Sequence, residues 1–334
     1  MANTISREIR LASRPHGIPT AANFTMVQTT LAPLNDQEVL VRNLFMSVDP
    51  YMRGRMNEGK SYVPQFEIGK PLEGSAVGEV IESHATGFNP GDIVTSSFGW
   101  REYFIATPHE LQPVSREILP LSVYLGALGM TGLTAWAGLN QGEVKAGETV
   151  YISGAAGAVG SVAGQLAKLR GCRVIGSAGS AEKVAFLLAE CGYDSAFNYK
   201  DSPVLDQLKL LAPDGIDVYF DNVGGESLEA ALATLRLHGR IIACGGISGY
   251  NAERPTPGPA NLFNITTRRL TMKGLMVFDW LDRQAEFREE AGGYFKAGKL
   301  KHKETLVEGI DNAVAAFLGL FHGQNVGKMV VKLT

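Results

Sequence analysis

The sequence contains little cysteine and no pattern of metal ligands. Its 334 residues include three cysteines, Cys172, Cys191 and Cys244, which are scattered and odd in number. This distribution excludes a disulfide framework and predicts buried, reduced thiols. Three cysteines are too few for a Cys₄ zinc site, and none of the six histidines stands at metal-ligand spacing from another histidine or a cysteine. We therefore expect a protein without a bound metal.

The sequence also lacks an excess of charge and a long apolar run. Lysine and arginine number 31 against 34 aspartate and glutamate, a net charge of −3, so nothing draws the chain to nucleic acid or an anionic membrane. No segment approaches the roughly 18 uninterrupted apolar residues of a membrane span. Residues 1–17 carry charges where a signal peptide needs an apolar core. We expect a cytoplasmic protein with neither nucleic acid nor membrane as a partner.

The hydrophobic patterning changes along the chain, whose length predicts two domains. Before residue 125, short alternating runs at 38–48, 75–83 and 91–100 indicate a β-rich domain. After residue 145, strands alternate with helices, and six strands predict a doubly wound parallel sheet and an α/β fold class. The predicted strands are 150–154, 173–178, 195–199, 216–221, 240–246 and 270–277. Residues 301–334 hold a strand, an amphipathic helix and a further strand, which we expect to return to the first domain.

The most informative segment is a glycine turn between the first of these strands and a helix expected over 161–170. Residues 155–160 read A-x-G-x-x-G. Gly157 lets the backbone approach a pyrophosphate, Gly160 allows close helix–strand packing, and the helix N-terminus offers free amides, with Ala158 and Val159 in between. The turn predicts a bound dinucleotide.

The next strand favours NADP over NAD. A protein that binds NAD is expected to carry an Asp or Glu about 20 residues after the glycine turn. Instead, residues 176–183 offer the hydroxyls of Ser177 and Ser180 and the ammonium of Lys183, which suit a 2′-phosphate. Glu182 is the nearest acid, and its place in the opening turn of a helix suits the helix dipole. The alternative is a solvated lysine at a helix start.

Two long loops are rich in proline and glycine, at 54–69 and 249–261. In a doubly wound fold the nicotinamide lies at the carboxyl ends of the strands, facing a cleft under the β-rich domain. The loops are placed in the sequence to border such a cleft, although both are equally compatible with plain surface excursions.

The chain resembles the zinc-independent medium-chain dehydrogenase/reductases of the prostaglandin reductase, alkenal reductase and curcumin reductase group. The shared motifs are ASRPHG (12–17), DPYMRGRM (49–56), GALGMTGLTAW (126–136), AAGAVGSVAGQLAKLRGC (155–172), GSAEKV (179–184), FDNVGGE (220–226), ISGYN (247–251) and QNVGK (324–328). Where zinc-dependent relatives carry Gly-His-Glu, residues 69–74 read Gly-Lys-Pro-Leu-Glu-Gly. The resemblance implies a GroES-like substrate domain over 1–125, a Rossmann NADP domain over 126–300, a segment 301–334 that returns to the first domain, and a homodimer.

The resemblance also implies an NADPH site. The turn Gly157–Gly160 would hold the pyrophosphate, Lys183 the 2′-phosphate, and Tyr199 would lie near the adenosine. Asn222 would line the groove, although by itself it is equally well a turn residue after a strand. The positions that would border the ribose and nicotinamide are Cys244, Gly245, Gly246, Ile247, Ser248, Leu275, Met276, Val277 and Asn325. Met130 is either a core residue or a soft wall beside the nicotinamide.

The reaction that the resemblance implies is transfer of hydride from NADPH to the β-carbon of an α,β-unsaturated ketone or aldehyde. Electrons then move to the carbonyl oxygen, so a donor must face a developing enolate. A tyrosine with a pKa of about 10 is protonated at neutral pH and suits this task. Tyr250 matches the family tyrosine that bonds the carbonyl, and Tyr51 a second one that lines the pocket. Without the resemblance, either is better read as an amphipathic residue at a domain seam.

Two arginines and three alternative functions complete the sequence-based expectations. Arg53 and Arg55 either attract an acidic substrate or clamp neighbouring backbone, and the second role is commoner. An NADPH quinone reductase would share the cofactor groove without needing Tyr250. A non-catalytic NADP-binding protein would not need Tyr51 and Tyr250 together. The missing ligands argue against a zinc alcohol dehydrogenase.

Overall fold

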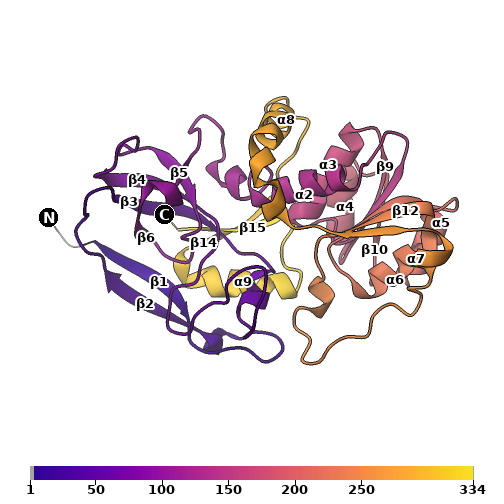
Figure 1. Cartoon of the computed structure of the whole chain (residues 1–334), viewed down its shortest axis with the longest axis horizontal. Helices are drawn as coiled ribbons and strands as arrows, with labels where there is room; N and C mark the ends of the chain where they lie inside the picture. The colour runs from indigo at the N-terminus through magenta and orange to yellow at the C-terminus, as the bar shows by residue number, and fades with distance from the viewer. Residues whose placement is uncertain (1–3, 334) are drawn as a thin grey trace. The chain divides into compact units, whose positions relative to one another are not determined.

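The structure, a computed structural model, describes residues 4–333 and divides them between two compact units (Figure 1). Unit 1 is Met1–Leu125 with Glu304–Thr334, and unit 2 is Gly126–Lys303. The first three residues of the segment in which we expect no signal peptide lie outside the described part. Among the residues described, no helix is long and apolar enough to cross a membrane.

Unit 1 is built mainly from antiparallel strands. Within its described residues, a seven-stranded sheet has the order β14-β15-β3-β4-β5-β7, with β6 also paired to β3, and β1 and β2 form a separate pair. The strands are β1 (Ile5–Leu11), β2 (Phe24–Thr30), β3 (Val39–Ser47), β4 (Ala76–Ser83), β5 (Ile93–Ser96), β6 (Tyr103–Ala106), β7 (Gln112–Pro113), β14 (Glu304–Glu308) and β15 (Lys328–Lys332). The helices are η1 (Ala21–Asn23), α1 (Met52–Arg55), η2 (Pro108–Glu110), η3 (Leu121–Leu125), η6 (Ile310–Asn312) and α9 (Ala313–Phe321). The expected β-rich texture is confirmed.

The C-terminal strand, helix and strand belong to unit 1. β15 pairs antiparallel with β3 and parallel with β14. Phe317 of α9 meets the ring of Trp100 edge-on at 5.9 Å, and Phe24 stacks on the same tryptophan at 6.3 Å. These buried rings form an aromatic centre of the unit's core.

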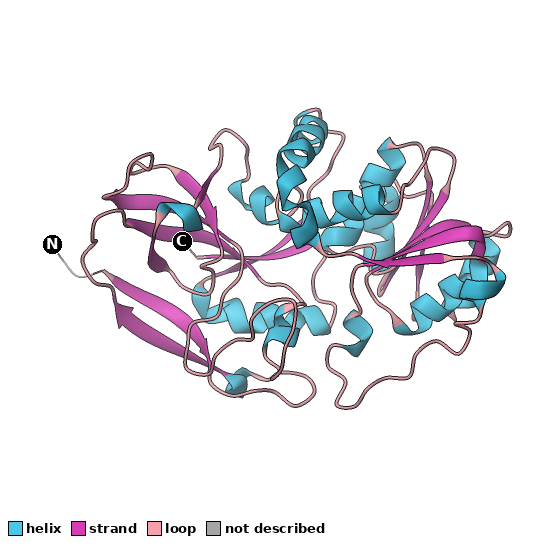
Figure 2. Cartoon of the chain, in the orientation of Figure 1, coloured by secondary structure: helices cyan, strands magenta, loops and turns pink. Residues whose placement is uncertain are grey.

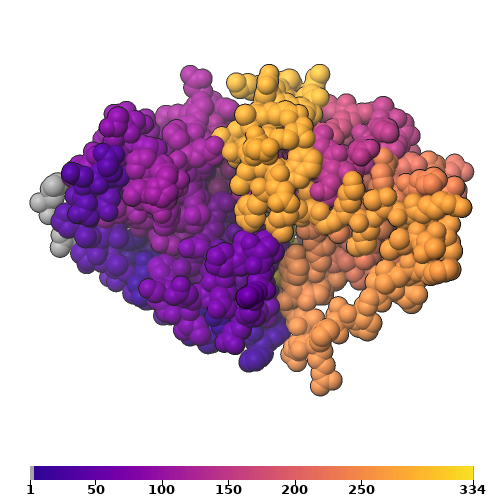
Figure 3. Space-filling view, viewed as in Figure 1, coloured from indigo at the N-terminus to yellow at the C-terminus, as the bar shows by residue number. Residues whose placement is uncertain are grey.

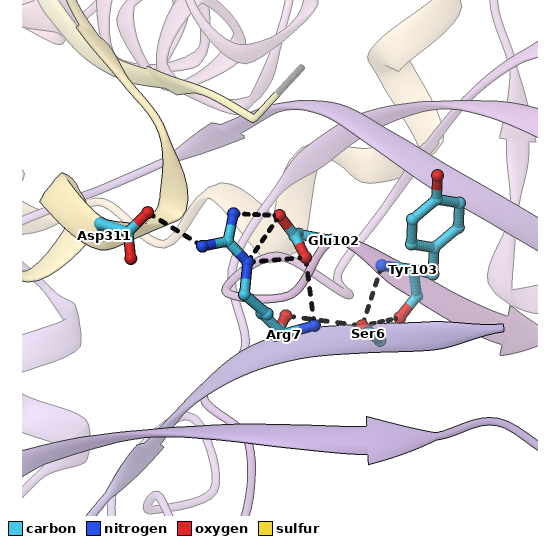
Figure 4. A network of polar contacts seen from close by, with 5 residues as sticks. All are labelled: Ser6, Arg7, Glu102, Tyr103 and Asp311. Carbon is cyan, nitrogen blue, oxygen red and sulfur yellow. Dashed lines mark hydrogen bonds and ion pairs between the residues drawn. The ribbon is translucent and has the colours of Figure 1, made fainter.

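A polar network at the surface also joins the two parts of unit 1. Figure 4 shows Arg7 of β1 between Glu102, just before β6, and Asp311 of η6. Its guanidinium lies 2.6 Å from the Glu102 carboxylate and 2.9 Å from that of Asp311. Because Asp311 is largely exposed, we assign the network a role in alignment rather than in stability.

Unit 2 is the predicted doubly wound fold, and the fold class is confirmed. Within its described residues, six parallel strands lie in the order β10-β9-β8-β11-β12-β13, with helices on both faces (Figure 2). The strands are β8 (Thr149–Ile152), β9 (Arg173–Ala178), β10 (Ser195–Asn198), β11 (Ile216–Asp221), β12 (Leu235–Ala243) and β13 (Thr271–Gly274). The helices are α2 (Met130–Gln141), α3 (Ala158–Leu169), α4 (Ala181–Ala189), α5 (Val204–Leu211), α6 (Gly225–Thr234), η4 (Ile247–Gly249), α7 (Asn264–Thr267), η5 (Val277–Arg283) and α8 (Gln284–Lys296).

Several predicted boundaries differ from the structure, and three of them adjoin the residues predicted to bind the cofactor. α3 begins at Ala158, three residues before the expected start. β12 ends at Ala243 rather than 246, because the N–H groups of Cys244 and Gly245 both donate to one carbonyl, that of Asp221, which ends the regular ladder. β13 ends at Gly274, and Val277 already begins η5.

Candidate cofactor and catalytic site

The glycine turn is held by close backbone packing. Gly157 is the N-cap of α3 and has no capping side chain, so the opening amides of the helix are left to face an anion. A Cβ on Gly160 would lie 2.6 Å from the Gly154 carbonyl oxygen and 2.7 Å from the Ala155 Cα. Only glycine fits there, and the turn therefore suits a pyrophosphate.

Gly160→Ala is expected to destabilise the protein by about 1–3 kcal/mol, because the added methyl group overlaps backbone that cannot swing away. The measurement is urea unfolding, read as the free energy of unfolding. Gly292→Ala in α8 is the matched control, since a Cβ there meets nothing within 4 Å, and we expect it to be neutral or stabilising by about 0.5–1 kcal/mol. Equal losses in both variants would contradict the packing argument.

The hydroxyls predicted to meet a 2′-phosphate are engaged within the protein. Ser177 is buried on β9, and its Oγ lies 2.9 Å from the hydroxyl oxygen of Tyr151. This placement turns the side chain into the fold, so we correct the expectation and no longer count Ser177 among the phosphate contacts. Ser180 is the N-cap of α4, where its Oγ accepts the N–H of Lys183 at 3.3 Å.

Two lysines and a tyrosine surround the start of α4. Burial, and next the charge of Lys200, lower the pKa of Lys183. The exposed side chain of Tyr199 reaches over Gly179, where a Cβ would lie 2.9 Å from its hydroxyl oxygen, and Lys200 Nζ lies 6.0 Å from its ring centre. Two lysines whose positive charges repel each other, Lys183 and Lys200, are suited to bind the doubly negative 2′-phosphate. Lys200 was not among the residues predicted from the sequence, although its place directly after Tyr199 was a usable signal.

The end of β11 carries Asn222, whose side chain is already bonded. Its Nδ2 donates to the Ser153 carbonyl oxygen at 2.8 Å, and its backbone N–H donates to Ser153 Oγ at 3.0 Å. Asn222 therefore acts as a turn residue that links the end of β11 to the end of β8, which was the alternative role expected from the sequence. A contact between Asn222 and the cofactor stays a prediction.

The segment after β12 is fastened to the segment after β11. Ser248 Oγ donates to the Val223 carbonyl oxygen at 2.6 Å, and the Ile247 N–H donates to the Asn222 carbonyl oxygen at 3.3 Å. Tyr250 directly follows η4, and its hydroxyl oxygen accepts the N–H of Gly246 at 3.3 Å. Burial raises the pKa of Tyr250, so the phenol stays protonated at neutral pH.

The other residues of unit 2 for which we predict a cofactor contact lie either directly after β13 or at the start of α2. The Leu275 N–H donates to the Ala243 carbonyl oxygen at 2.9 Å, and Met276 and Val277 come directly after it. Met130 is the half-buried first residue of α2. Because the strands are parallel, the segments after β8, β9, β10, β11, β12 and β13 share the carboxyl edge of one sheet, where a dinucleotide binds in this fold.

Tyr51 and Asn325 lie in unit 1. Burial, and next the charge of Asp49, raise the pKa of Tyr51. Asp49 in turn lies 3.1 Å from Nζ of the buried Lys328, which fixes the backbone just before the tyrosine. Asn325 donates its side-chain N–H to the Gly327 carbonyl oxygen at 2.9 Å.

The two arginines beside Tyr51 have structural contacts. Arg53 donates to the Gly17 carbonyl oxygen at 2.9 Å, and Arg55 lies 2.6 Å from Glu73 and covers the Phe66 ring at 4.1 Å. Arg55 also bonds the Pro64 carbonyl oxygen at 2.8 Å, which pins the loop 54–69. The second loop, 249–261, stands out from unit 2 between η4 and α7 (Figure 3). Across residues 4–333, no group of three potential metal ligands comes together.

The fold and the uncapped glycine turn define the class: a protein with a Rossmann dinucleotide-binding domain. Family models described as N-terminal domain of oxidoreductase and as zinc-binding dehydrogenase match residues 7–114 and 158–292. The NADP(+)-dependent 2-alkenal reductase of Nicotiana tabacum is 44% identical, with 100% of this chain and 99% of the relative covered. The NADPH-dependent curcumin reductase of Escherichia coli (strain K12) is 38% identical, with 97% and 95% covered. The crystal structure of CurA from Vibrio vulnificus in complex with NADPH is 39% identical, with a TM-score of 0.94 over 98% of this chain and 99% of that chain.

The chain therefore belongs to the medium-chain dehydrogenase/reductases, in the group of the prostaglandin, alkenal and curcumin reductases. It is an NADP-dependent oxidoreductase, and the predicted cofactor is confirmed. The roles of individual residues remain predictions.

Proposed function

We propose that this protein uses NADPH to reduce the carbon–carbon double bond of small-molecule α,β-unsaturated aldehydes and ketones, leaving the carbonyl intact. The observation that carries the proposal is Tyr250, a half-buried phenol with a raised pKa at the carboxyl edge of the Rossmann sheet. Such a group donates a hydrogen bond to an oxyanion without a metal. The alkenal and curcumin reductases to which the chain is similar support this substrate class.

The proposed mechanism divides the work between few residues. Bound NADPH supplies a hydride to the β-carbon. Tyr250 donates a hydrogen bond from its O–H to the substrate carbonyl oxygen, which lowers the energy of the enolate. The carbon–carbon π pair shifts toward the carbonyl carbon, and the carbonyl π pair moves onto that oxygen. Tyr51 orients the substrate. A proton from solvent then adds to the α-carbon, which restores the carbonyl and completes the saturated product.

The cofactor contacts follow the strand ends. The turn from Gly157 to Gly160 binds the pyrophosphate at the α3 N-terminus. Lys183, Lys200 and Tyr199 receive the 2′-phosphate and adenosine, and Ser180 orders the backbone beneath them. Cys244–Ser248 and Leu275–Val277 border the ribose and nicotinamide. We also propose that the enzyme works without zinc, as a cytoplasmic homodimer, with unit 1 as the substrate domain.

The proposal is tested by NADPH oxidation at 340 nm with four acceptors: a 2-alkenal, an aryl enone, a 15-oxo-prostanoid and a quinone. We expect turnover of the unsaturated carbonyls with saturated carbonyl products, and much slower turnover with NADH. Each reaction is followed by product analysis, because oxidation of NADPH alone does not say which bond was reduced.

The rival functions give different results in the same assay. A quinone reductase would turn over the quinone alone, and its rate would survive the loss of Tyr250. A non-catalytic protein would bind NADPH and oxidise none of it. Either pattern would contradict the proposal.

A further inference from the structure

Asp221, the last residue of β11, is a buried carboxylate that the proposed chemistry does not use. Its residue is 2% exposed. Oδ1 accepts the N–H of Gly224 at 2.7 Å, the N–H of Val223 at 2.9 Å and the hydroxyl of Tyr219 at 2.7 Å. Across residues 4–333, no lysine, arginine or histidine pairs with it. A buried carboxylate without a cation is costly, so its contacts require an explanation.

The same residue also holds the segment after β12. Its carbonyl oxygen accepts the N–H of Cys244 and that of Gly245, both at 2.9 Å. The side chain therefore orders the turn after β11, while the backbone anchors the turn after β12. Tyr250 depends on this arrangement, because its hydroxyl oxygen bonds the next amide, that of Gly246.

We propose that Asp221 is a positioning residue that orders the nicotinamide half of the cofactor groove. Its carboxylate accepts the N–H groups of the turn after β11, and its backbone carbonyl oxygen accepts those of the segment after β12. The inference rests on the proposed assignment of residues 244–250 to that half. The adenosine half is built around α4 and does not depend on this carboxylate. The two halves of the cofactor are therefore expected to respond differently to a change at Asp221.

The test is Asp221→Asn, which keeps the shape and removes the charge that the N–H donors share. We expect the Kd for NADPH, measured by its fluorescence, to rise about tenfold, since hydrogen bonds to a charged acceptor are stronger than those to a neutral one. The Kd for 2′,5′-ADP, which carries the adenosine and 2′-phosphate alone, is expected to change less than about twofold by calorimetry.

Two further variants keep the inference falsifiable. Tyr219→Phe removes one donor to the carboxylate and is expected to weaken NADPH binding about threefold with 2′,5′-ADP unaffected; it carries the test if Asp221→Asn does not fold. Tyr151→Phe is the matched control, because its ring stacks on Tyr219 at 5.0 Å while its hydroxyl contacts Ser177. We expect that control to change neither Kd.

Equal weakening of both ligands by Asp221→Asn would mean a general loss of structure and would overturn the inference, as would unchanged NADPH binding. The results that would overturn this inference can be distinguished from those that would contradict the proposed function. A failure of the proposed function appears in the unmodified protein, either as absent enone turnover or as 2′,5′-ADP binding no tighter than 5′-AMP.

Discussion

Tyr250→Phe is expected to lower kcat for an enone by about 100- to 1000-fold, the loss typical of removing one donor to a developing oxyanion. The ring stays in place and only the hydroxyl oxygen is lost, which in the resting structure accepts the Gly246 N–H. The measurement is steady-state turnover with NADPH. A deuteride isotope effect with 4-deuterated NADPH shows whether hydride transfer limits the rate.

The matched control is Tyr294→Phe in α8, a half-buried tyrosine of the same unit, which is expected to leave kcat within about twofold. The pH profile adds a second readout. Because burial raises the pKa of Tyr250 and the protonated phenol is the active form, activity is retained through pH 9 and falls only above the ordinary tyrosine pKa of about 10. An unchanged kcat for Tyr250→Phe while hydride transfer limits the rate would show that another group stabilises the enolate.

Lys183→Ala is expected to raise the KM for NADPH by about 10- to 100-fold, the loss of one charge-assisted contact to a phosphate. The KM for NADH is expected to change less than about threefold, because that cofactor has no 2′-phosphate. Steady-state kinetics with both cofactors measure this difference. The backbone N–H of Lys183, which Ser180 caps, is unaffected by the substitution.

Lys209→Ala in the last turn of α5 is the control for the loss of an exposed positive charge. It is expected to leave both Michaelis constants within about twofold. A rise in the NADH constant as large as that for NADPH, seen with Lys183→Ala, would show that Lys183 orders the fold and does not read the phosphate.

The sequence predicted the elements that have strong local signals. The six strands of unit 2 were predicted as apolar runs separated by helical stretches, and Gly160 was predicted from the spacing of the turn. Ser177 could not be placed in this way. A serine at a strand end points to either face of the sheet, and here the Tyr151 hydroxyl on the neighbouring strand holds it inside.

Hydrogen bonds and ion pairs between residues far apart in the chain could not be predicted from the sequence either. Asp221 looked like an ordinary strand end, because the four N–H groups that its carboxylate and carbonyl accept come from two separate turns. From the sequence, Arg53 and Arg55 could either attract an acidic substrate or clamp neighbouring groups. The structure shows Arg53 bonded to the Gly17 carbonyl oxygen and Arg55 paired with Glu73. Strand ends differed from the prediction where backbone hydrogen bonds to a turn replaced the regular pairing of the strands, as after Ala243 at the end of β12.

The position of β15 between β14 and β3 bears on how the chain is made. Unit 2 occupies one continuous stretch, 126–303, so during synthesis it has every strand of its sheet while unit 1 is incomplete. β3 leaves the ribosome early, and its neighbour at residues 328–332 emerges only after all of unit 2. Until then the edge of β3 that β15 will occupy is open, and the domain proposed to hold the substrate matures after the domain proposed to bind the cofactor.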